Sequence, residues 1–178
     1  RNVAAKEKKA VGVFSLEMSR EQVTDRLLAS EAEVDLWRLR TGHLRSEQGD
    51  FTRLRDAMET LSQAPIFIDD SASPSSIELR AKARRLQMEH GLDLIIIDYL
   101  QLMPTGNSHY AGNLVQEISE ITRSLKQIGR ELHIPIVALS QLSRAVEPRP
   151  GHPRRPALSQ VDVPGAAGRG PVGPVPGR

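Results

Sequence analysis

The sequence predicts an α/β fold with a mostly parallel sheet flanked by helices. The first observation is that short apolar runs alternate with longer segments in which apolar residues recur every three or four positions. The second is that each pair of apolar runs is separated by at least one such helical segment, which is typical of βαβ units. At 178 residues the chain is long enough for one domain with a full hydrophobic core.

Four apolar runs are expected to form the strands. They cover residues 11–16, 65–70, 91–103 and 135–140. The third is the longest and lies between Gly91 and Pro104. A continuous apolar run of this kind predicts a strand at the centre of a parallel sheet, buried on both faces.

Helices are expected in the segments between these runs. They cover residues 20–32, 35–40, 46–63, 75–90 and 114–132. Ser19 with Gln22 three residues later is a capping-box pattern for the first helix, and Gly91 ends the fourth. Four of the helices carry apolar residues at helical spacing. In chain order these are Val23, Leu27 and Leu28; Phe51, Leu54, Met58 and Leu61; Ile77, Leu79, Ala83, Leu86 and Met88; and Ile118, Ile121, Leu125 and Ile128. Residues 104–112 are rich in turn formers and predict a loop.

Composition excludes several classes of protein. The chain has no cysteine, so disulfides and thiolate chemistry are excluded, and this fits a cytosolic protein. No apolar run approaches the roughly 20 residues of a membrane span, and no signal peptide is visible. The formal charge of +2 is too small to indicate a nucleic-acid partner by itself.

A polar side chain stands where the apolar stretch of three predicted strands ends, which in the third strand is after Leu94–Ile97. Glu17, Asp98 and Gln141 stand at these positions, and parallel strands bring their carboxyl ends to one edge of a sheet. Two carboxylates and an amide suit phosphoryl transfer to water: one carboxylate holds Mg²⁺, one activates the water, and the amide senses the terminal phosphate. Each residue also has a structural interpretation, with Glu17 as an acid in a first helical turn, Asp98 as a loop cap and Gln141 as a satisfied loop amide.

Three segments resemble consecutive motifs of the DnaB-type replicative helicases. They are Val13–Ser19, Leu94–Met103 and Leu139–Arg144, and the connecting segments Trp37–Gly42 and Glu117–Lys126 also match. The resemblance covers residues 1–160, which are therefore expected to form part of a RecA-like P-loop ATPase domain that is incomplete at both ends. Trp37 is expected in core or subunit packing.

The resemblance implies an ATP-dependent DNA helicase that binds ATP and Mg²⁺ and encircles single-stranded DNA as a homohexamer, unwinding 5′→3′. Glu17 resembles the catalytic glutamate, Asp98 the Mg²⁺-binding Walker B aspartate and Gln141 the switch residue. The loop carrying Thr105, Gly106 and Asn107 resembles a DNA-binding loop of the central channel. Primase and a helicase loader are the implied partners, the bacterial cytoplasm is the implied location, and no membrane association is expected.

Two departures from the family pattern limit what this chain is expected to do. The phosphate-binding G-x-x-x-x-G-K-[ST] loop is absent, and Val161–Arg178 consists largely of Gly, Ala, Pro, Val and Arg where the family has a second DNA loop and an arginine finger. We therefore expect residues 161–178 to be unstructured, hypothesise a frameshift there, and expect the chain alone to be inactive. Two alternatives stay open, a RecA-like ATPase of recombination or repair and a degenerate, non-catalytic module that packs in a ring or binds a partner.

Overall fold

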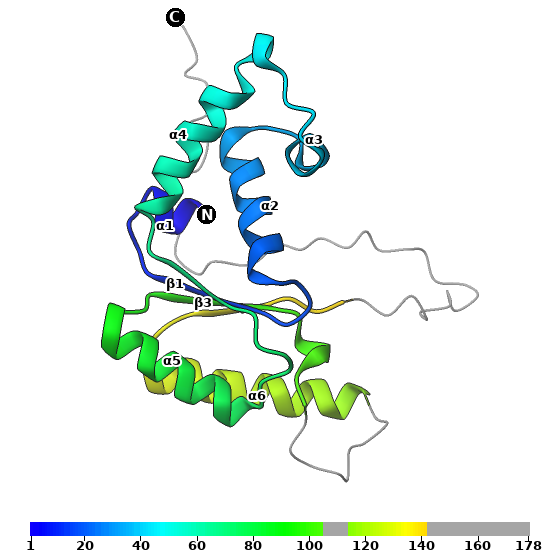
Figure 1. Ribbon diagram of the computed structural model, residues 1–178. Helices are drawn as coiled ribbons and strands as arrows, with labels where there is room; N and C mark the ends of the chain where they lie inside the picture. The colour runs from blue at the N-terminus through cyan, green and yellow to red at the C-terminus, as the bar shows by residue number, and fades with distance from the viewer. Residues whose placement is uncertain (105–113, 142–178) are drawn as a thin grey trace, which may run out of the picture. The chain divides into compact units, whose positions relative to one another are not determined.

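The computed structural model describes residues 1–104 and 114–141, and it has the predicted α/β fold (Figure 1). The strands are β1 (Val11–Ser15), β2 (Ile66–Asp69), β3 (Leu94–Asp98) and β4 (Ile136–Ala138). They form one four-stranded sheet in the order β2-β1-β3-β4, with every pair parallel. The two central strands, β1 and β3, are therefore the ones that Glu17 and Asp98 follow.

Helices connect the strands as predicted, with a difference in the segment 46–63, and the strand predicted over residues 91–103 ends at Asp98 and is followed by a 3-10 turn. The helices are α1 (Asn2–Ala5), α2 (Arg20–Ala32), α3 (Leu36–Thr41), α4 (Asp50–Ser62), α5 (Ser76–His90) and α6 (Leu114–Leu132), with 3-10 turns η1 (Ser46–Gln48) and η2 (Leu100–Leu102). The helix predicted over residues 46–63 is split at Gly49, which has φ +70°, a left-handed conformation that a continuous helix cannot contain. None of the helices in the described residues is long and apolar enough to cross a membrane.

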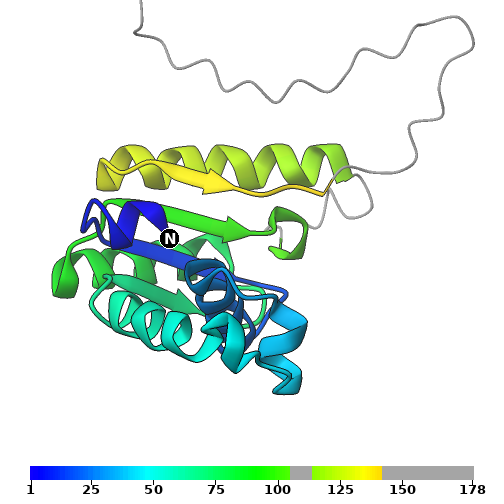
Figure 2. The ribbon, with the colours of Figure 1, turned by 90° about the horizontal axis from the view of Figure 1, so that it is seen from above.

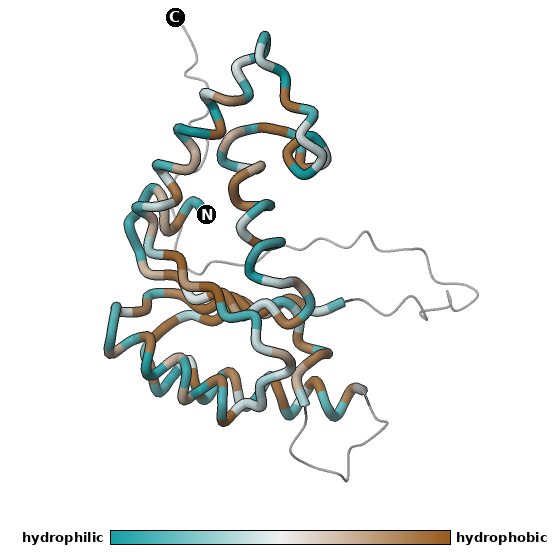
Figure 3. Tube along the Cα trace, viewed as in Figure 1, coloured by the Kyte–Doolittle hydropathy of each residue, from teal (hydrophilic) through white to brown (hydrophobic). Residues whose placement is uncertain are grey.

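The main core lies between the sheet and the helices α5 and α6 (Figures 1 and 2). Its most deeply buried side chains come from both layers, and Leu79, Ile95, Ile97 and Ile128 each have 0% of their surface exposed. Figure 3 shows apolar residues along the strands and polar residues on the outer sides of these helices. Fully burying each of these side chains contributes roughly 1.5–3 kcal/mol, so this core anchors the sheet.

The other face of the sheet is covered less completely, which corrects one prediction. Ile95 and Ile97 are buried, but Leu94 and Ile96 on the opposite face are only half-buried, so β3 is not buried on both faces. The reason is visible in Figure 1, where α2 and α4 rise away from the sheet instead of lying along it.

Helices α2, α3 and α4 form a second, smaller core of their own. It contains Ala32, Val34, Leu54 and Ala57, with Leu28, Leu39 and Leu44 packed against it. Of the predicted α4 stripe, Phe51 and Met58 remain 57% and 59% exposed because only one side of α4 meets α2. The buried part of the predicted α5 stripe is also narrower than expected, because Ile77 and Met88 are exposed.

Candidate functional site

The register of the two central strands places Glu17 beside Asp98. Ser15 of β1 pairs with Asp98 of β3, and the next backbone N–H, that of Leu16, donates to the Asp98 carbonyl oxygen at 2.7 Å. Glu17 follows at once. Two acids separated by eighty residues of sequence thus meet at the carboxyl edge of the sheet, as the order of strands and helices predicted.

The turn that carries Glu17 is held by several hydrogen bonds. The Ser15 hydroxyl donates to the Met18 carbonyl at 2.8 Å, and Ser19 and Gln22 form the predicted capping box. The backbone N–H of Arg20 donates to a carboxylate oxygen of Asp70 at 2.9 Å, which ties the start of α2 to the end of β2. The N-cap of α2 is Ser19, so Glu17 lies before the helix, and its interpretation as an acid of the first helical turn is wrong.

Glu17 and Asp98 line the same cavity, which has a volume of about 440 Å³. The full lining is Glu17, Met18, Gln22, Asp25, Arg26, Leu36, Arg40 and Asp98. Within residues 1–104 and 114–141, neither the Glu17 nor the Asp98 carboxylate accepts a hydrogen bond or forms an ion pair. Two carboxylates without a partner among these residues face one cavity, so both are free to bind a cation.

The donor set fits Mg²⁺ shared with a substrate. Mg²⁺ prefers oxygen ligands and is usually held by one or two carboxylates together with water and substrate phosphates. Among the described residues there is no group of three acidic, histidine or cysteine side chains that could hold a metal without such help. Asp98, half-buried at the end of β3, and the more exposed Glu17 are the cavity residues that could contact the ion or its water shell.

Gln141 lies at the same edge of the sheet but not in this cavity. Leu139 donates to the Ile97 carbonyl at 2.9 Å, so the chain after β4 runs beside the chain after β3. The side-chain amide of Gln101 donates to the Gln141 carbonyl at 2.9 Å, and its oxygen accepts from the Gln141 N–H at 3.3 Å. Thr105, Gly106 and Asn107 lie outside the described residues, so their predicted contact with DNA stays a prediction.

Comparison with known proteins decides the family. The family described as DnaB-like helicase C terminal domain matches residues 1–167. The chain belongs to this family. The match extends past the boundary predicted at residue 160, and the division of the chain there stays a prediction.

Individual relatives agree with that assignment. The chain is 51% identical to the replicative DNA helicase DnaB of Synechocystis over 162 residues, covering 90% of this chain and 18% of the relative. It is 48% identical to the replicative DNA helicase DnaB of Geobacillus stearothermophilus over 160 residues, covering 90% of this chain and 34% of the relative. The chain therefore spans about a fifth to a third of the length of these relatives.

A solved structure supports the fold. A DnaB-like replicative helicase, described together with its interactions with primase, superposes with a TM-score of 0.74 at 30% identity. The superposition covers 87% of this chain and 36% of that one. The RecA-like ATPase fold predicted from the sequence is thus confirmed.

The cavity of this DnaB-like domain also contains residues that the sequence analysis did not select. Gln22, Asp25 and Arg26 are spaced so that they share one face of α2, and Leu36 and Arg40 share one face of α3. The spacing on α2 was readable, but nothing in the sequence told which face of that helix meets the strand ends. Trp37 is 62% exposed and stacks on His43, with ring centroids 5.1 Å apart, so it is not a core residue of this chain.

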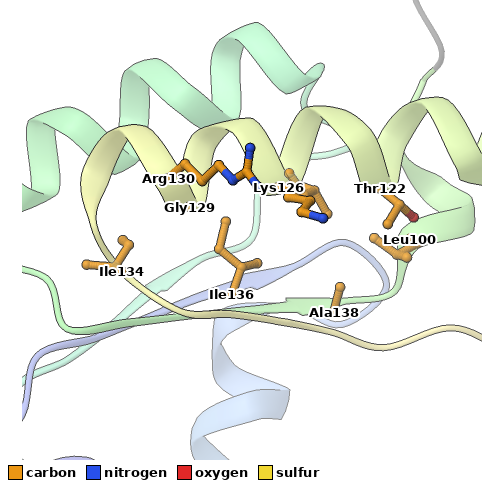
Figure 4. Close-up of a pocket in the computed structure, with 9 residues that line it drawn as sticks. Leu100, Thr122, Lys126, Gly129, Arg130, Ile134, Ile136 and Ala138 are labelled. Atoms are coloured by element: carbon orange, nitrogen blue, oxygen red, sulfur yellow. The ribbon is translucent and has the colours of Figure 1, made fainter.

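A second cavity of about 480 Å³ lies between α6 and β4 (Figure 4). Its lining is Leu100, Thr122, Leu125, Lys126, Gly129, Arg130, Ile134, Ile136 and Ala138. Most of these side chains are apolar and none is a carboxylate, so the cavity offers no acid to hold Mg²⁺ or to accept a proton from water. The cavity lined by Glu17 and Asp98, called the acid cavity below, is the candidate catalytic site because its carboxylates stand at the ends of the two central strands.

Proposed function

We propose that the longer protein containing this chain is an ATP-driven replicative DNA helicase and that the acid cavity is part of its ATPase site. The observation that carries the proposal is that Glu17 and Asp98 line one cavity at the ends of the central strands and have no partner among the described residues. Asp98 supports the proposal most strongly, because it is half-buried yet accepts no hydrogen bond from the described residues, whereas buried polar groups usually have a partner. Membership of the DnaB-like helicase family supplies the reaction that such a pair would serve.

Each acid has a distinct role in this proposal. Glu17 is exposed in a turn whose two ends are held by the hydrogen bonds of Ser15 and Arg20. It can therefore orient the attacking water and accept its proton. Asp98 is half-buried at the end of β3, which suits a group that holds Mg²⁺ through its water shell. Mg²⁺, when bound, neutralises charge on the phosphate oxygens and on both acids.

The hydrogen bonds of Gln141 support a link between hydrolysis and DNA. Gln101, which bonds to the backbone of Gln141, lies three residues after Asp98, in the segment that leads toward Thr105. A change at Gln141 on loss of the terminal phosphate would pull on that segment directly. We propose that this path carries the signal from the phosphate to the loop of Thr105, Gly106 and Asn107, which contacts single-stranded DNA.

The remaining properties are proposed for the longer protein. It assembles as a homohexamer around single-stranded DNA, moves 5′→3′, and works with a primase and a loader in the bacterial cytoplasm. The solved relative described with primase supports the choice of that partner. The recombination and repair alternative gains no support, because the relatives compared above are replicative helicases.

Glu17→Gln in the full-length protein tests the proposal. The variant should lose ATP hydrolysis by about 10²–10⁴-fold, because the amide cannot accept the proton of the water, while retaining ATP binding. Unwinding of a forked duplex should fall with it. Glu59→Gln, an exposed glutamate on α4, is the matched control and should hydrolyse ATP at the wild-type rate.

A Glu17→Gln protein that hydrolyses ATP like the wild type would overturn the role of Glu17. If Asp98→Asn were equally harmless, the acid cavity would not be an ATPase site. The alternative of a non-catalytic module that packs in a ring or binds a partner would then be favoured.

A further inference from the structure

The acid cavity contains cations as well as acids. Of its lining residues, Glu17, Asp25 and Asp98 are acidic and Arg26 and Arg40 are basic. Arg40 pairs with Asp25 through Nε and Oδ2 at 3.8 Å. Arg26 has no hydrogen bond or ion pair to any residue that the structure describes. An unpaired guanidinium that shares a cavity with two unpaired carboxylates calls for a ligand that satisfies both.

The positions of the two arginines are fixed by their helices. Arg26 lies one turn after Gln22 on the face of α2 that lines the cavity, and Arg40 lies one turn after Leu36 on α3. Helix α3 is anchored from its other side, where Arg38 bonds to the buried carboxylate of Asp50 at 3.0 Å. The two arginines therefore line the cavity from α2 and α3, whereas Glu17 and Asp98 line it from the ends of the strands.

Charge decides the order in which ligands can enter. With Asp25 and Arg40 neutralising each other, Glu17, Asp98 and Arg26 leave one net negative charge, which disfavours an anion. A divalent cation on the two carboxylates makes the net charge positive. An oxyanion is then attracted to the cavity, and guanidinium groups bind phosphate oxygens through two parallel N–H donors.

We propose that Arg26, assisted by Arg40, forms an oxyanion subsite that takes a phosphate group only when Mg²⁺ is bound at Glu17 and Asp98. The identity of that phosphate as the group cleaved from ATP rests on the proposed function. The binding of phosphate itself does not. Arg26 thereby becomes a phosphate-binding residue, and the Arg38–Asp50 pair a positioning pair for α3.

The test is a titration of the 178-residue chain with inorganic phosphate, with and without MgCl₂. The Nε–Hε resonances of the arginines, observed by NMR, report which side chains bind. We expect the resonances of Arg26 and Arg40 to shift with a dissociation constant in the millimolar range, and only in the presence of Mg²⁺. Arg26→Gln should weaken this binding about tenfold or more, since hydrogen bonds between charged groups are lost.

Two further variants separate the subsite from general charge effects. Arg26→Lys should retain part of the affinity, because it keeps the charge but loses the planar fork. Arg55→Gln removes an equally cationic, 77% exposed side chain from α4 and should leave binding unchanged. Because Arg26 is exposed and unpaired, Arg26→Gln should keep the wild-type Tm within about 2 °C, which excludes misfolding as the cause.

Three results would overturn the proposal. They are the absence of phosphate binding in Mg²⁺, equal binding without Mg²⁺, and unchanged binding in Arg26→Gln. None of them depends on turnover, so the subsite can fail while the full-length protein still hydrolyses ATP. Conversely, phosphate bound as expected by a protein whose activity is indifferent to Glu17→Gln would leave the subsite standing and remove the proposed function.

Discussion

Asp50 and the pair Glu17 and Asp98 show the same chemical group in opposite environments. The Asp50 carboxylate is completely buried, yet it accepts hydrogen bonds from the Arg45 N–H at 2.9 Å, Arg38 at 3.0 Å and Arg53 at 2.6 Å. Glu17 and Asp98 are accessible from a cavity and have no such donors among the described residues. One acid is neutralised by the fold, while the other two are left for something outside it.

The difference separates a structural acid from a functional one without reference to any relative. A carboxylate whose oxygens are all satisfied by the protein stabilises the folded state, and losing it leaves its cationic partners unpaired. A carboxylate that accepts no hydrogen bond from the protein contributes no such stability and is free to bind a ligand. The two kinds of acid should therefore respond in opposite ways to the same substitution.

Asp50→Asn should produce the largest loss of stability. The amide cannot neutralise Arg38 and Arg53, and it brings an N–H₂ group against donors, so the Tm should fall by on the order of 10 °C. Thermal unfolding followed by circular dichroism measures this. Asp56→Asn is the control on the same helix, because the Asp56 side chain is 64% exposed and pairs with the neighbouring Arg55 alone within residues 1–104 and 114–141.

Equal Tm values for the Asp50 and Asp56 variants would contradict the comparison. They would mean that the buried ion cluster is replaceable by neutral hydrogen bonds. The α3 helix, which Arg38 fixes to this cluster, would then need another explanation for its position.

The positions of Glu17 and Asp98 could be predicted from the sequence, whereas the buried environment of Asp50 could not, and the reason is physical. Glu17 and Asp98 follow buried strands, and parallel pairing alone brings such positions together, so the strand pattern was sufficient to predict their meeting. The environment of Asp50 depends on the left-handed turn at Gly49, which splits the predicted helix near its start, and on Arg38 from another helix. No local period reports such contacts.

For the fold as well, the topology of the sheet could be predicted from the sequence, but the orientation of the helices could not. Alternation of strands and helices gave the parallel sheet, because the connections leave few other topologies. The exposure of Phe51 and Met58 was not predictable, since it depends on how steeply α4 meets α2, which a hydrophobic stripe does not state. Arg26 and Arg40 could not be predicted as cavity residues for the same reason, since the sequence does not state how α2 and α3 are oriented toward the strand ends.

Acidification should reduce the stability that Asp50 provides, with a smaller change in Tm than the substitution of Asp50. The backbone N–H of Arg45, followed by the side chains of Arg53 and Arg38, holds the pKa of Asp50 below its ordinary value despite burial. The stabilisation is therefore fully present above the unfolded pKa of about 3.9 and is lost as the pH falls through the lower, folded pKa. The Tm of the wild type should drop in that window, and Asp50→Asn should show a shallower drop.

The acid transition should not vanish in Asp50→Asn, because Asp69 contributes to it too. Burial alone would raise the pKa of Asp69, but hydrogen bonds from Lys82 and Ser71 outweigh it and lower the pKa. Asp50→Asn and Asp69→Asn together should flatten the pH dependence further than either variant. An unaltered acid transition in Asp50→Asn would show that Asp50 does not titrate with folding.

Glu17→Gln and Asp98→Asn should have the smallest effect on stability. Each removes a carboxylate that has no donor among the described residues, so the Tm should stay within about 2 °C of the wild type. Differential scanning calorimetry of the 178-residue chain without Mg²⁺ is the appropriate measurement. A Tm loss as large as that of Asp50→Asn would place these acids with the structural ones. An unchanged Tm together with lost hydrolysis in the full-length protein would mean that the fold keeps two unsatisfied charges because the reaction needs them.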